Sequence, residues 1–435
     1  MSEATGRVGP RGCRHSSTDR HLGRAPTEDP DELGESVVSD DVLRAVLAET
    51  LAWSRGREYA GWDYADGMSS RIRRALPVEN RWLNLAFQET VKRAPVNVRP
   101  LFLVEQRRNY KGAGLFAMAN LTADRLELES TDPTVEYERE AEELLEWLLE
   151  NRCPGYSGFC GGHSHEIQTF EFVSYPDEPS VVSTTYPVRA LLAGSHLEDT
   201  YPAVATSAVD FLVEDLAYRE AETGAVIDYY PGETDDYYTI NAGALGARLL
   251  LDCYAHTGEE PMLERARALL AHIATLQNDR GGWYYREPAD ASHLSMDSFH
   301  NGFILEAFQR YADVADDRFA STLTDGLAFY SPLFAPTGAP RWDESSRYPR
   351  DIHACAQGIL VFTYEGRLQA ARRILEWTLE NLYDDGRFYF RKQRHYTKRM
   401  TLMRWCQAWM AYAIAEHLRV CEEVRTSGRF STALS

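Results

Sequence analysis

The sequence predicts an all-α fold, an (α/α)6 toroid in which helical hairpins close into a ring, with short β-hairpin-like loops at one rim. Three observations support this prediction. A unit recurs about every 50–70 residues from Tyr110 to the C-terminus. Each unit begins with a helix that is apolar nearly all round, and a second helix with one charged face follows it. A short aromatic segment that contains glycine then closes the unit. Alternation of this kind produces an inner and an outer ring of helices.

The inner ring is predicted from about six segments. Apolar residues surround each of them, which predicts burial on every side. The segments are Tyr110–Leu121, Val182–Gly194, Thr239–Tyr254, Asp297–Tyr311, Asp351–Tyr364 and Leu402–His417.

The outer ring is predicted from helices that carry charge on one face and leucine or alanine on the other. These are Glu136–Asn151, Ala203–Arg219, Pro261–Gln277, Phe319–Tyr330 and Leu368–Leu382. We expect helix Arg81–Arg93 to supply another outer element and helix Val42–Trp53 to pack across one end. The closing segments are too short for a sheet core and predict hairpin-like loops at one rim: Val226–Tyr230, Gly282–Tyr285, Arg341–Asp343 and Gly386–Phe390.

The length and composition predict a single large domain. A chain of 435 residues with 44% hydrophobic content can bury a sizeable core, and no break divides the repeat. We expect the domain to span residues 41–420. Residues 1–40 have no apolar periodicity and predict a disordered tail, and residues 421–435 predict a second tail.

The charge excludes some classes of partner. The formal net charge is −20, and lysine occurs only at Lys92, Lys111, Lys392 and Lys398. Such acidity suits a salt-rich cytoplasm, because salt screens the repulsion among the acidic groups. It disfavours nucleic acid as a partner.

The cysteines and the apolar runs indicate a reduced, cytoplasmic protein. The seven cysteines are scattered, and most lie in apolar segments, which disfavours a disulfide framework. Cys153 and Cys160 lie close to His163 and His165, but the spacing is not that of a zinc finger, so we predict no metal and no cofactor. Charge or turn residues interrupt each apolar run before the ~20 residues that a membrane span needs, and the N-terminus has no apolar signal core.

The candidate site is the mouth where the inner helices begin, because free backbone N–H groups converge there. Polar residues gather at these starts: Asn109, Tyr110, Lys111, Thr184, Thr185, Tyr237, Tyr238, Asn241, Asp297, His300, Asn301, Asp351, His353, Arg404, Trp405 and Gln407. Most could be helix caps, and N-capping competes with catalysis for Asp297 and Asp351.

Asp with His recurs at two successive inner helices, and this recurrence favours chemistry. The pairs are Asp297 with His300 and Asp351 with His353. Paired carboxylates suit glycoside cleavage, in which one group protonates the leaving oxygen and the other attacks or activates water. Paired histidines suit removal and return of a proton at a sugar carbon. The sequence offers both, and the alternative for each histidine is a hydrogen-bonded core residue.

Several other residues are candidates for substrate binding. Arg404 could grip a carboxylate or phosphate, although a structural ion pair is a close alternative. Trp283, Trp405 and Tyr285 could stack on a sugar ring. Tyr238, Asn241 and Gln407 are polar residues at helix starts. The loop Gly61–Ser70 could close the mouth and deliver Asp63 or Asp66, or it could be a plain turn.

Several motifs resemble those of known proteins. RDIHACAQ, MDSFHNGF, MRWCQAWM, the Gly61–Ser70 loop and the segment Pro95–Gly112 resemble bacterial and haloarchaeal six-hairpin proteins encoded with surface-polysaccharide or protein-glycosylation genes. More distantly, the chain is similar to the six-hairpin glycosidase superfamily, to N-acylglucosamine 2-epimerases and to uronate C5-epimerases. The resemblance implies a fold more safely than a reaction.

Three functional hypotheses follow. The first is a carbohydrate-active enzyme of surface-polysaccharide or N-glycan assembly, whose substrate is a sugar or oligosaccharide, acidic or lipid-linked among the candidates. The second is a non-catalytic glycan-binding or scaffolding protein that contacts other glycan-assembly enzymes. The third, a terpene-cyclase-like toroid, requires an Asp-rich motif, and the short pairs Asp235–Asp236 and Asp316–Asp317 match it poorly.

Overall fold

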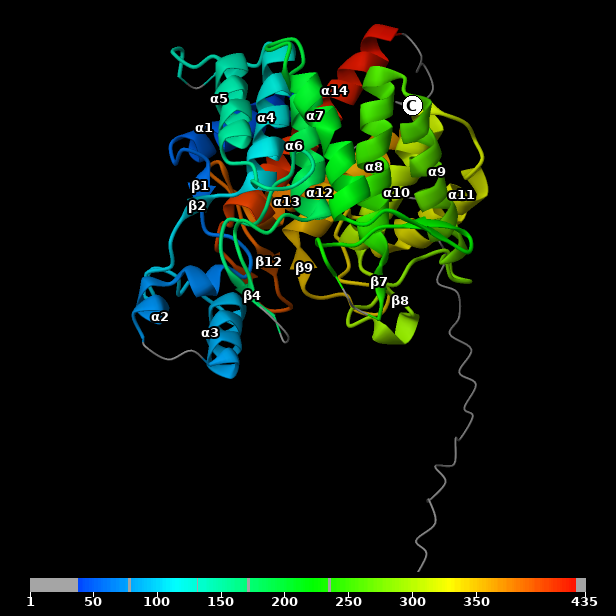
Figure 1. The fold of residues 1–435 in the computed structure, drawn as a ribbon. Coiled ribbons are helices and arrows are strands. Elements are labelled where there is room, and N and C mark those ends of the chain that lie inside the picture. The colour runs from blue at the N-terminus through cyan, green and yellow to red at the C-terminus, as the bar shows by residue number, and fades with distance from the viewer. Residues whose placement is uncertain (1–37, 77–79, 131, 170–172, 234–235, 428–435) are drawn as a thin grey trace, which may run out of the picture.

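Within the described residues, six long helices form a closed inner ring (Figure 1). The computed structural model describes residues 38–76, 80–130, 132–169, 173–233 and 236–427. The inner helices are α4 (Tyr110–Arg125), α6 (Val181–Ala193), α8 (Ile240–Thr257), α10 (Ser298–Val314), α12 (Ile352–Tyr364) and α14 (Trp409–Ser427). Each packs against the next, and α14 packs against α4, which closes the ring. The predicted (α/α)6 toroid is confirmed.

A second layer of helices covers the first. It comprises α5 (Tyr137–Glu150), α7 (Tyr201–Asp210), α9 (Glu260–Thr275), α11 (Ala320–Tyr330), α13 (Leu368–Leu382) and α1 (Asp40–Arg55). The outer helices α5, α7, α9, α11 and α13 each pack on the inner helix that precedes them in the chain, whereas α1 packs on α14. The two ends of the domain therefore form the last hairpin of the ring together.

Two predicted placements are corrected. Helix α1, expected across an end, is an outer helix, because Leu43, Leu47 and Leu51 form a fully buried face against the ring. Helix α3 (Arg81–Arg93), expected in the outer ring, instead packs on the 3-10 turn Asp66–Ser69 at the rim. It buries only Gln88 and Val91, which is too little apolar surface to fill a place in the outer ring. Together with α2 (Arg71–Ala75) it projects beyond the ring in Figure 1.

Short antiparallel strands gather at the end of the ring where the inner helices begin, the lower end in Figure 1. The pairs are β1 (Ala60–Gly61) with β2 (Arg107–Arg108), β3 (Ile167–Gln168) with β4 (Val173–Ser174), and β7 (Tyr238–Thr239) with β8 (Arg286–Glu287). A three-stranded sheet has the order β13 (Thr397–Lys398), β12 (Arg391–Lys392), β9 (Arg350–Asp351). Two further hairpins are β5 (Arg219–Ala221) with β6 (Gly224–Val226) and β10 (Tyr383–Asp384) with β11 (Arg387–Phe388). Strands β2, β7 and β9 lead into inner helices, so the rim positions the helix starts.

Short turns complete the element list. They are the 3-10 turns Asp66–Ser69, Ala289–Ala291 and Ser331–Leu333, and the π-helical turns Phe211–Asp215 and Met403–Ala408. The second π-helical turn immediately precedes α14 and holds Arg404 and Trp405. Single π-helical turns are frequent at functional sites.

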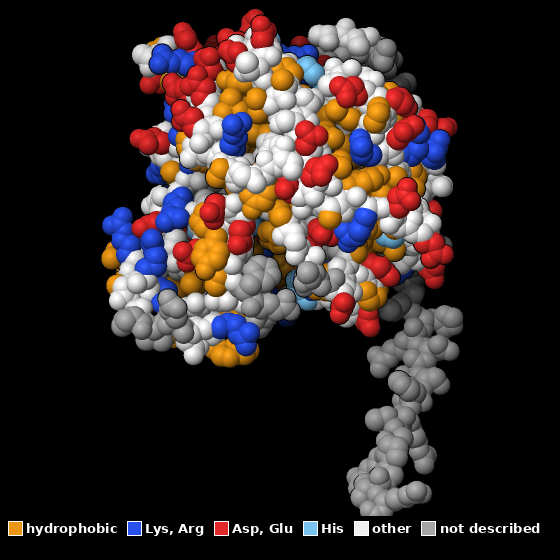
Figure 2. Space-filling view, in the orientation of Figure 1, with side chains coloured by type: hydrophobic (Ala, Val, Ile, Leu, Met, Phe, Trp, Pro, Cys, Tyr) orange, Lys and Arg blue, Asp and Glu red, His pale blue; other side chains and the backbone are white. Residues whose placement is uncertain are grey.

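Small residues let the inner helices approach closely. A methyl group added at Gly114 of α4 would lie 2.9 Å from the backbone nitrogen of Pro187 in α6. Because Gly114 has no side chain, the α6 backbone can occupy the space that a side chain would fill. Figure 2 shows acidic side chains spread over the outer surface of the helical body.

The predicted tails are only partly within the described residues. Helix α14 continues to Ser427, so the start of the predicted tail 421–435 is helical, which corrects that boundary. Most of the predicted tail 1–40 lies outside the described residues, and α1 begins at Asp40 with Ser39 as its N-cap. The six described cysteines are all buried and free. No described helix has both the length and the apolar content to cross a membrane.

Candidate functional site

Polar side chains cap the inner helices at the mouth of the ring. Asn109, Ser180, Asp297 and Asp351 each accept a hydrogen bond from a backbone N–H in the first turn of the following helix. The capping role considered for both aspartates is thus present. Each aspartate has a second oxygen, and the partner of that oxygen distinguishes the two sites.

Asp297 and His300 form a pair in the first turn of α10. The Asp297 Oδ2 atom lies 2.6 Å from His300 Nδ1, while Oδ1 accepts from the His300 backbone N–H at 2.8 Å. This contact fixes the orientation of the ring. The other ring nitrogen, Nε2, has no hydrogen-bond partner among the described residues. The ring of Tyr285 lies beside His300, with centroids 4.5 Å apart, and burial raises the pKa of Tyr285 to about 12.

Asp351 is occupied by protein donors on both oxygens. Oδ1 accepts from the His353 backbone N–H and from Trp405 Nε1, each at 2.8 Å. Oδ2 accepts from Arg391 of β12. Asp351 is 1% exposed. Protein donors therefore contact both oxygens of Asp351, one of which caps α12.

His353 is buried without a hydrogen-bond partner. The residue is 2% exposed, and neither ring nitrogen has a hydrogen-bond partner in the described chain. Aromatic rings surround it: Phe299 at 5.0 Å, Trp405 at 4.6 Å and Trp409 at 4.5 Å between centroids. Burial, then the nearby Lys111 and Arg404 cations, hold the pKa of His353 well below its ordinary value, so the ring is neutral at pH 7. Because an unsatisfied buried polar group costs about 1–3 kcal/mol, two such nitrogens indicate a ligand position.

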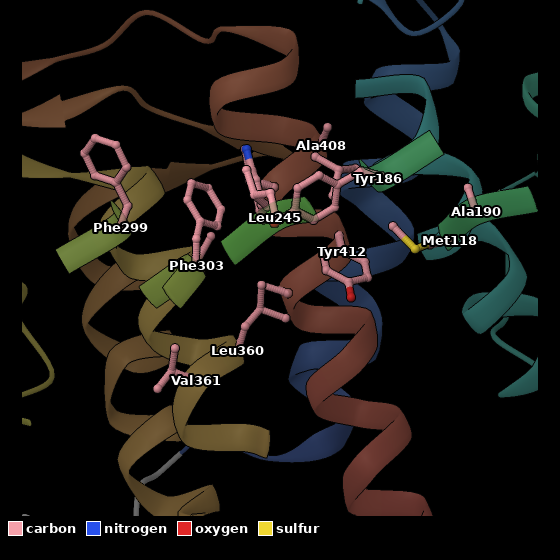
Figure 3. Packing of buried hydrophobic residues seen from close by; sticks show 14 of the residues in the cluster. Met118, Tyr186, Ala190, Leu245, Phe299, Phe303, Leu360, Val361, Ala408 and Tyr412 are labelled. Carbon is pink, nitrogen blue, oxygen red and sulfur yellow. The ribbon is translucent and has the colours of Figure 1, made fainter. Parts of the chain in front are cut away.

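Sequence reasoning gave Lys111 no functional role, but the structure makes it prominent. Its Nζ atom lies over the rings of Tyr186, Phe303 and Trp409, at 4.5, 5.0 and 4.8 Å from their centroids. Figure 3 shows Tyr186 and Phe303 projecting from α6 and α10 into the space that the ring encloses. Lys111 is 4% exposed, and burial lowers its pKa well below the ordinary value.

Lys111 differs from the other lysines in its partners. Lys92, Lys392 and Lys398 each donate to an oxygen of Glu89, Asn381 or the Arg93 backbone. Lys111 has no hydrogen-bond or ion-pair partner among the described residues. One sequence signal could have found it, since a lysine in an otherwise apolar inner helix is unusual where arginine supplies nearly every cation.

The loop Gly61–Ser70 brings Asp63 to the mouth. Asp63 Oδ2 accepts from Arg404 Nε at 2.7 Å and from Asn109 Nδ2 at 3.0 Å. The ion-pair alternative for Arg404 is therefore present through Nε, whereas its two terminal nitrogens have no hydrogen-bond partner among the described residues. Asp66 instead forms a buried ion pair with Arg99 at 2.8 Å, away from the helix starts. Only one of the two predicted loop aspartates joins the candidate site.

Three predicted binding residues do not face the mouth. Trp283 is a core residue that stacks on Phe308 and donates to the Ile273 carbonyl. Gln407 is fully buried and bonds to the backbone of Gly386 and Phe388 at the β10–β11 hairpin. The Tyr238 ring lies against His272 of the outer helix α9. Position at a helix start, which suggested Gln407 and Tyr238, does not determine which way a side chain points, and an aromatic residue type, which suggested Trp283, serves a core as well as a site.

Three further residues are compatible with a place beside the candidate site: Asn241, Trp405 and His163. Asn241 is buried in the first turn of α8, and its Oδ1 atom has no hydrogen-bond partner in the described chain. Trp405 stacks on Tyr64 with centroids 4.6 Å apart. Burial lowers the pKa of His163 to about 3, and its Nε2 lies 3.4 Å from the Tyr230 hydroxyl. The described residues contain no cluster of three or more His, Cys, Asp or Glu side chains suited to a metal ion.

Two surface cavities lie away from the mouth. One, of about 550 Å³, is lined by residues that include Arg350, Trp377 and Lys392. The other, of about 270 Å³, lies near Tyr59 and Trp147. Neither is lined by a histidine. The unpartnered groups of the mouth therefore define the candidate site more sharply than cavity size does.

Comparison with known proteins supports the fold. No protein-family model matches the chain, and no curated protein matches it. A sugar epimerase from a ruminal bacterium is 13% identical, with a TM-score of 0.57 over 73% of this chain and 90% of that one. A GH76 alpha-mannanase from Bacteroides thetaiotaomicron is 12% identical, with a TM-score of 0.56 over 74% and 89%. A possible GH105 member from Salmonella enterica is 11% identical, with a TM-score of 0.56 over 92% and 99%. The chain thus shares the six-hairpin glycosidase-like fold, as the distant resemblance implied.

Proposed function

We propose that this protein is a sugar epimerase in which His300 and His353 transfer a proton at one sugar carbon. The observation that carries the proposal is the pairing of these histidines. They begin neighbouring inner helices, and both rings contact Phe299, with centroids at 4.1 Å and 5.0 Å. Both have ring nitrogens without a hydrogen-bond partner in the described chain. Histidine suits this task because a neutral ring nitrogen can accept a proton and a protonated one can return it.

The carboxylates favour epimerisation over glycoside hydrolysis. A glycosidase needs one carboxyl group to protonate the leaving oxygen and another to attack the sugar or activate water. Both Asp297 oxygens contact His300, and both Asp351 oxygens accept from protein donors. Neither aspartate is left to act on a glycosidic bond. We therefore assign Asp297 to orienting His300, and Asp351 to holding the α12 start and Trp405.

The proposed step conserves mass. Neutral His353 takes the proton from a carbon next to a carbonyl group, and the electrons of the C–H bond move to the carbonyl oxygen to give an enediolate. A proton from His300 Nε2 then passes to the opposite face of that carbon, and the carbonyl group re-forms. In the reverse direction the roles exchange. The cations Lys111 and Arg404 lie near His353 and would stabilise the enediolate oxygen.

Arg404 also suggests the substrate class. Its Nε atom is held by Asp63, which leaves the terminal N–H groups for a second anion. A guanidinium fits a carboxylate in a bidentate manner. We propose an acidic sugar, such as a uronate, as the preferred substrate. The sequence resemblance alone suggests that the protein acts in surface-polysaccharide or N-glycan assembly in the cytoplasm. Whether the substrate is an isolated or a lipid-linked sugar is likewise a prediction.

The test is a survey of sugars by NMR. D-Glucuronate, D-mannose and cellobiose are incubated with the protein, and the appearance of an epimer of unchanged mass is followed. His300→Asn and His353→Asn should each lower the rate by about 10²–10⁴-fold, because each removes a proton-transfer group. His256→Asn, at an exposed position near the end of α8, should leave the rate unchanged.

Other outcomes distinguish the alternatives. Shortened oligosaccharides would indicate hydrolysis or lysis. Binding without any chemical change, insensitive to His300→Asn but weakened by Trp405→Ala, would favour the glycan-binding hypothesis. The pathway is tested separately, by comparing surface glycans of cells that make the native protein with those that make His300→Ala. An altered ring stereochemistry would support the assignment, and an identical glycan would contradict it.

A further inference from the structure

Exposed apolar side chains are concentrated in one small part of the surface. Seven large apolar residues that are 40 to 75% exposed lie between Ile72 and Leu103: Ile72, Leu76, Trp82, Leu83, Val96, Leu101 and Leu103. Only four other large hydrophobic residues in the described chain reach a comparable exposure. We call the unit formed by α2, α3 and residues 94–103 the rim projection. Exposed apolar side chains gathered in one unit of the chain are a feature of interaction sites.

The same unit reverses the charge of the protein. Residues 71–103 hold seven Arg and Lys against two Glu, a net charge of +5 in a chain whose formal net charge is −20. Figure 2 shows basic side chains gathered over this lower corner, whereas acidic side chains spread over the helical body. Arg71 and Arg93 are mostly exposed, and their ion pairs with Glu105 and Glu89 are surface pairs of little strength.

The rim projection is firmly attached to the ring. The ion pair between Asp66 and Arg99 is almost fully buried. Gln88 exchanges hydrogen bonds with the Gln168 backbone at 3.0 and 3.2 Å, and Lys398 donates to the Arg93 carbonyl at 2.9 Å. Phe87 packs edge-on against Phe102. The exposed side chains are therefore presented by a fixed scaffold.

We propose that the rim projection docks the protein on an anionic lipid surface. Tryptophan and leucine beside arginine suit the boundary between lipid headgroups and acyl chains, where apolar side chains insert and cations meet anionic headgroups. The positive unit is complementary to such a surface, and the acidic body is repelled by it. This combination orients the molecule with the rim projection toward the lipid.

The orientation has a consequence for the site. The rim projection lies at the end of the ring where the short strands and the inner-helix starts lie (Figure 1). Docking therefore turns this end, and the candidate site with it, toward the lipid surface. The docking proposal does not depend on the proposed function. If both hold, the mouth is placed to receive a sugar that is attached to a lipid.

The test is cosedimentation with lipid vesicles at 0.1 M NaCl. The full chain should bind vesicles of phosphatidylglycerol and phosphatidylcholine in a 1:2 ratio and should bind pure phosphatidylcholine at least about tenfold more weakly. Trp82→Ser/Leu101→Ser should lower binding at least about tenfold through lost insertion. Arg71→Gln/Arg93→Gln should weaken it by a comparable factor, and more at low salt than at high salt.

Matched variants at other exposed positions serve as controls. Val42→Ser removes an exposed apolar side chain of α1, and Arg139→Gln removes an exposed cation of α5. These should bind as the native protein does. Circular dichroism checks that every variant is folded. No binding of the native protein to the anionic vesicles would overturn the proposal. So would a dimer in sedimentation velocity that Trp82→Ser/Leu101→Ser dissociates, because a second copy would then cover the projection.

Discussion

At the scale of single residues, the mouth differs from the deeper lumen in how its polar groups are paired. Farther along the inner helices, Arg248 contacts the carboxylates of Asp252 and Glu306, and Gln357 also donates to Glu306. These buried charges pair with one another, although Gln357 Oε1 has no hydrogen-bond partner in the described chain. At the mouth, His353 and Lys111 make no side-chain hydrogen bond at all within the described residues. Buried polar groups are normally hydrogen-bonded, so these two side chains support the mouth as the candidate site.

His417 provides a pH test that is separate from the mouth. Burial lowers its pKa from 6.5 to about 3, and its ring contacts the Thr363 hydroxyl and Cys421. The unfolded chain binds a proton below pH 6.5 that the folded chain does not bind. The stability is therefore full above pH 6.5 and falls as the pH decreases toward 3.

We expect His417→Gln to flatten this dependence. Between pH 6.5 and 5, the free energy of unfolding of the variant should fall less steeply, by up to about 1.4 kcal/mol per pH unit. Urea denaturation at a series of pH values measures the slope. His256→Gln changes an exposed histidine and should keep the native slope. Equal slopes for His417→Gln and the native protein would show that His417 takes up its proton in the folded state.

Residue identity predicted only part of the site. The pairing of Asp297 with His300 follows from a local spacing that puts both in one helical turn, and the sequence predicts it. The donors to Asp351 include Trp405 and Arg391 of β12, and the aromatic rings around His353 come from other parts of the chain. No local spacing reveals these contacts. Lys111 was placed at the mouth by its position at a helix start, but it was given no role, because the aromatic rings around it come from three different inner helices. Trp283 was misplaced because the same aromatic residue type serves a core and a sugar site.

At the scale of secondary-structure elements, the sequence predicted which segments are helical. It did not predict the positions of two helices, α1 and α3, in the fold. Five of the six predicted inner-helix starts lie within one residue of the observed ones, because capping residues and apolar runs are local signals. The sixth was predicted at Leu402, whereas a π-helical turn occupies Met403–Ala408 and α14 starts at Trp409. The places of α1 and α3 depend on surfaces made by distant parts of the chain. An amphipathic pattern shows that a face is buried and does not show against what.

Helix α1 packs on α14, the helix that closes the ring, so we expect its buried face to contribute much of the free energy of unfolding. Leu47 is fully buried between α1 and its neighbours, and Leu47→Ala should cost about 2–5 kcal/mol through lost burial and the cavity left behind. Val42→Ala, on the exposed side of the same helix, should cost no more than about 0.5 kcal/mol. Urea denaturation followed by circular dichroism compares the two. Equal effects would show that α1 does not seal the ring.

At the scale of the whole molecule, charge is distributed unevenly. The chain carries a formal net charge of −20, yet the rim projection is basic. Self-repulsion among surface carboxylates destabilises a compact state, and salt screens it. Buried pairs such as Asp66 with Arg99 are screened much less, so salt should leave them largely intact.

Raising KCl from 0.1 M to 2 M should therefore increase the melting temperature. We expect a rise of at least about 2 °C, which corresponds to roughly 1 kcal/mol for a large domain. Differential scanning fluorimetry measures the shift, and sucrose at the same osmolality separates screening from exclusion of the solute. An unchanged or lower melting temperature in KCl would contradict the expectation of a salt-adapted protein.

The most direct test of proton transfer at the mouth is deuterium incorporation from heavy water. D-Glucuronate is incubated with the protein in D2O, and mass spectrometry and NMR follow the recovered sugar. We predict the gain of one non-exchangeable deuterium at a single carbon, together with inversion there, and loss of both signals in His300→Asn and His353→Asn. A panel that extends to D-mannose and cellobiose covers the substrate class. Recovery of every sugar without carbon-bound deuterium, or incorporation that survives both substitutions, would contradict the account.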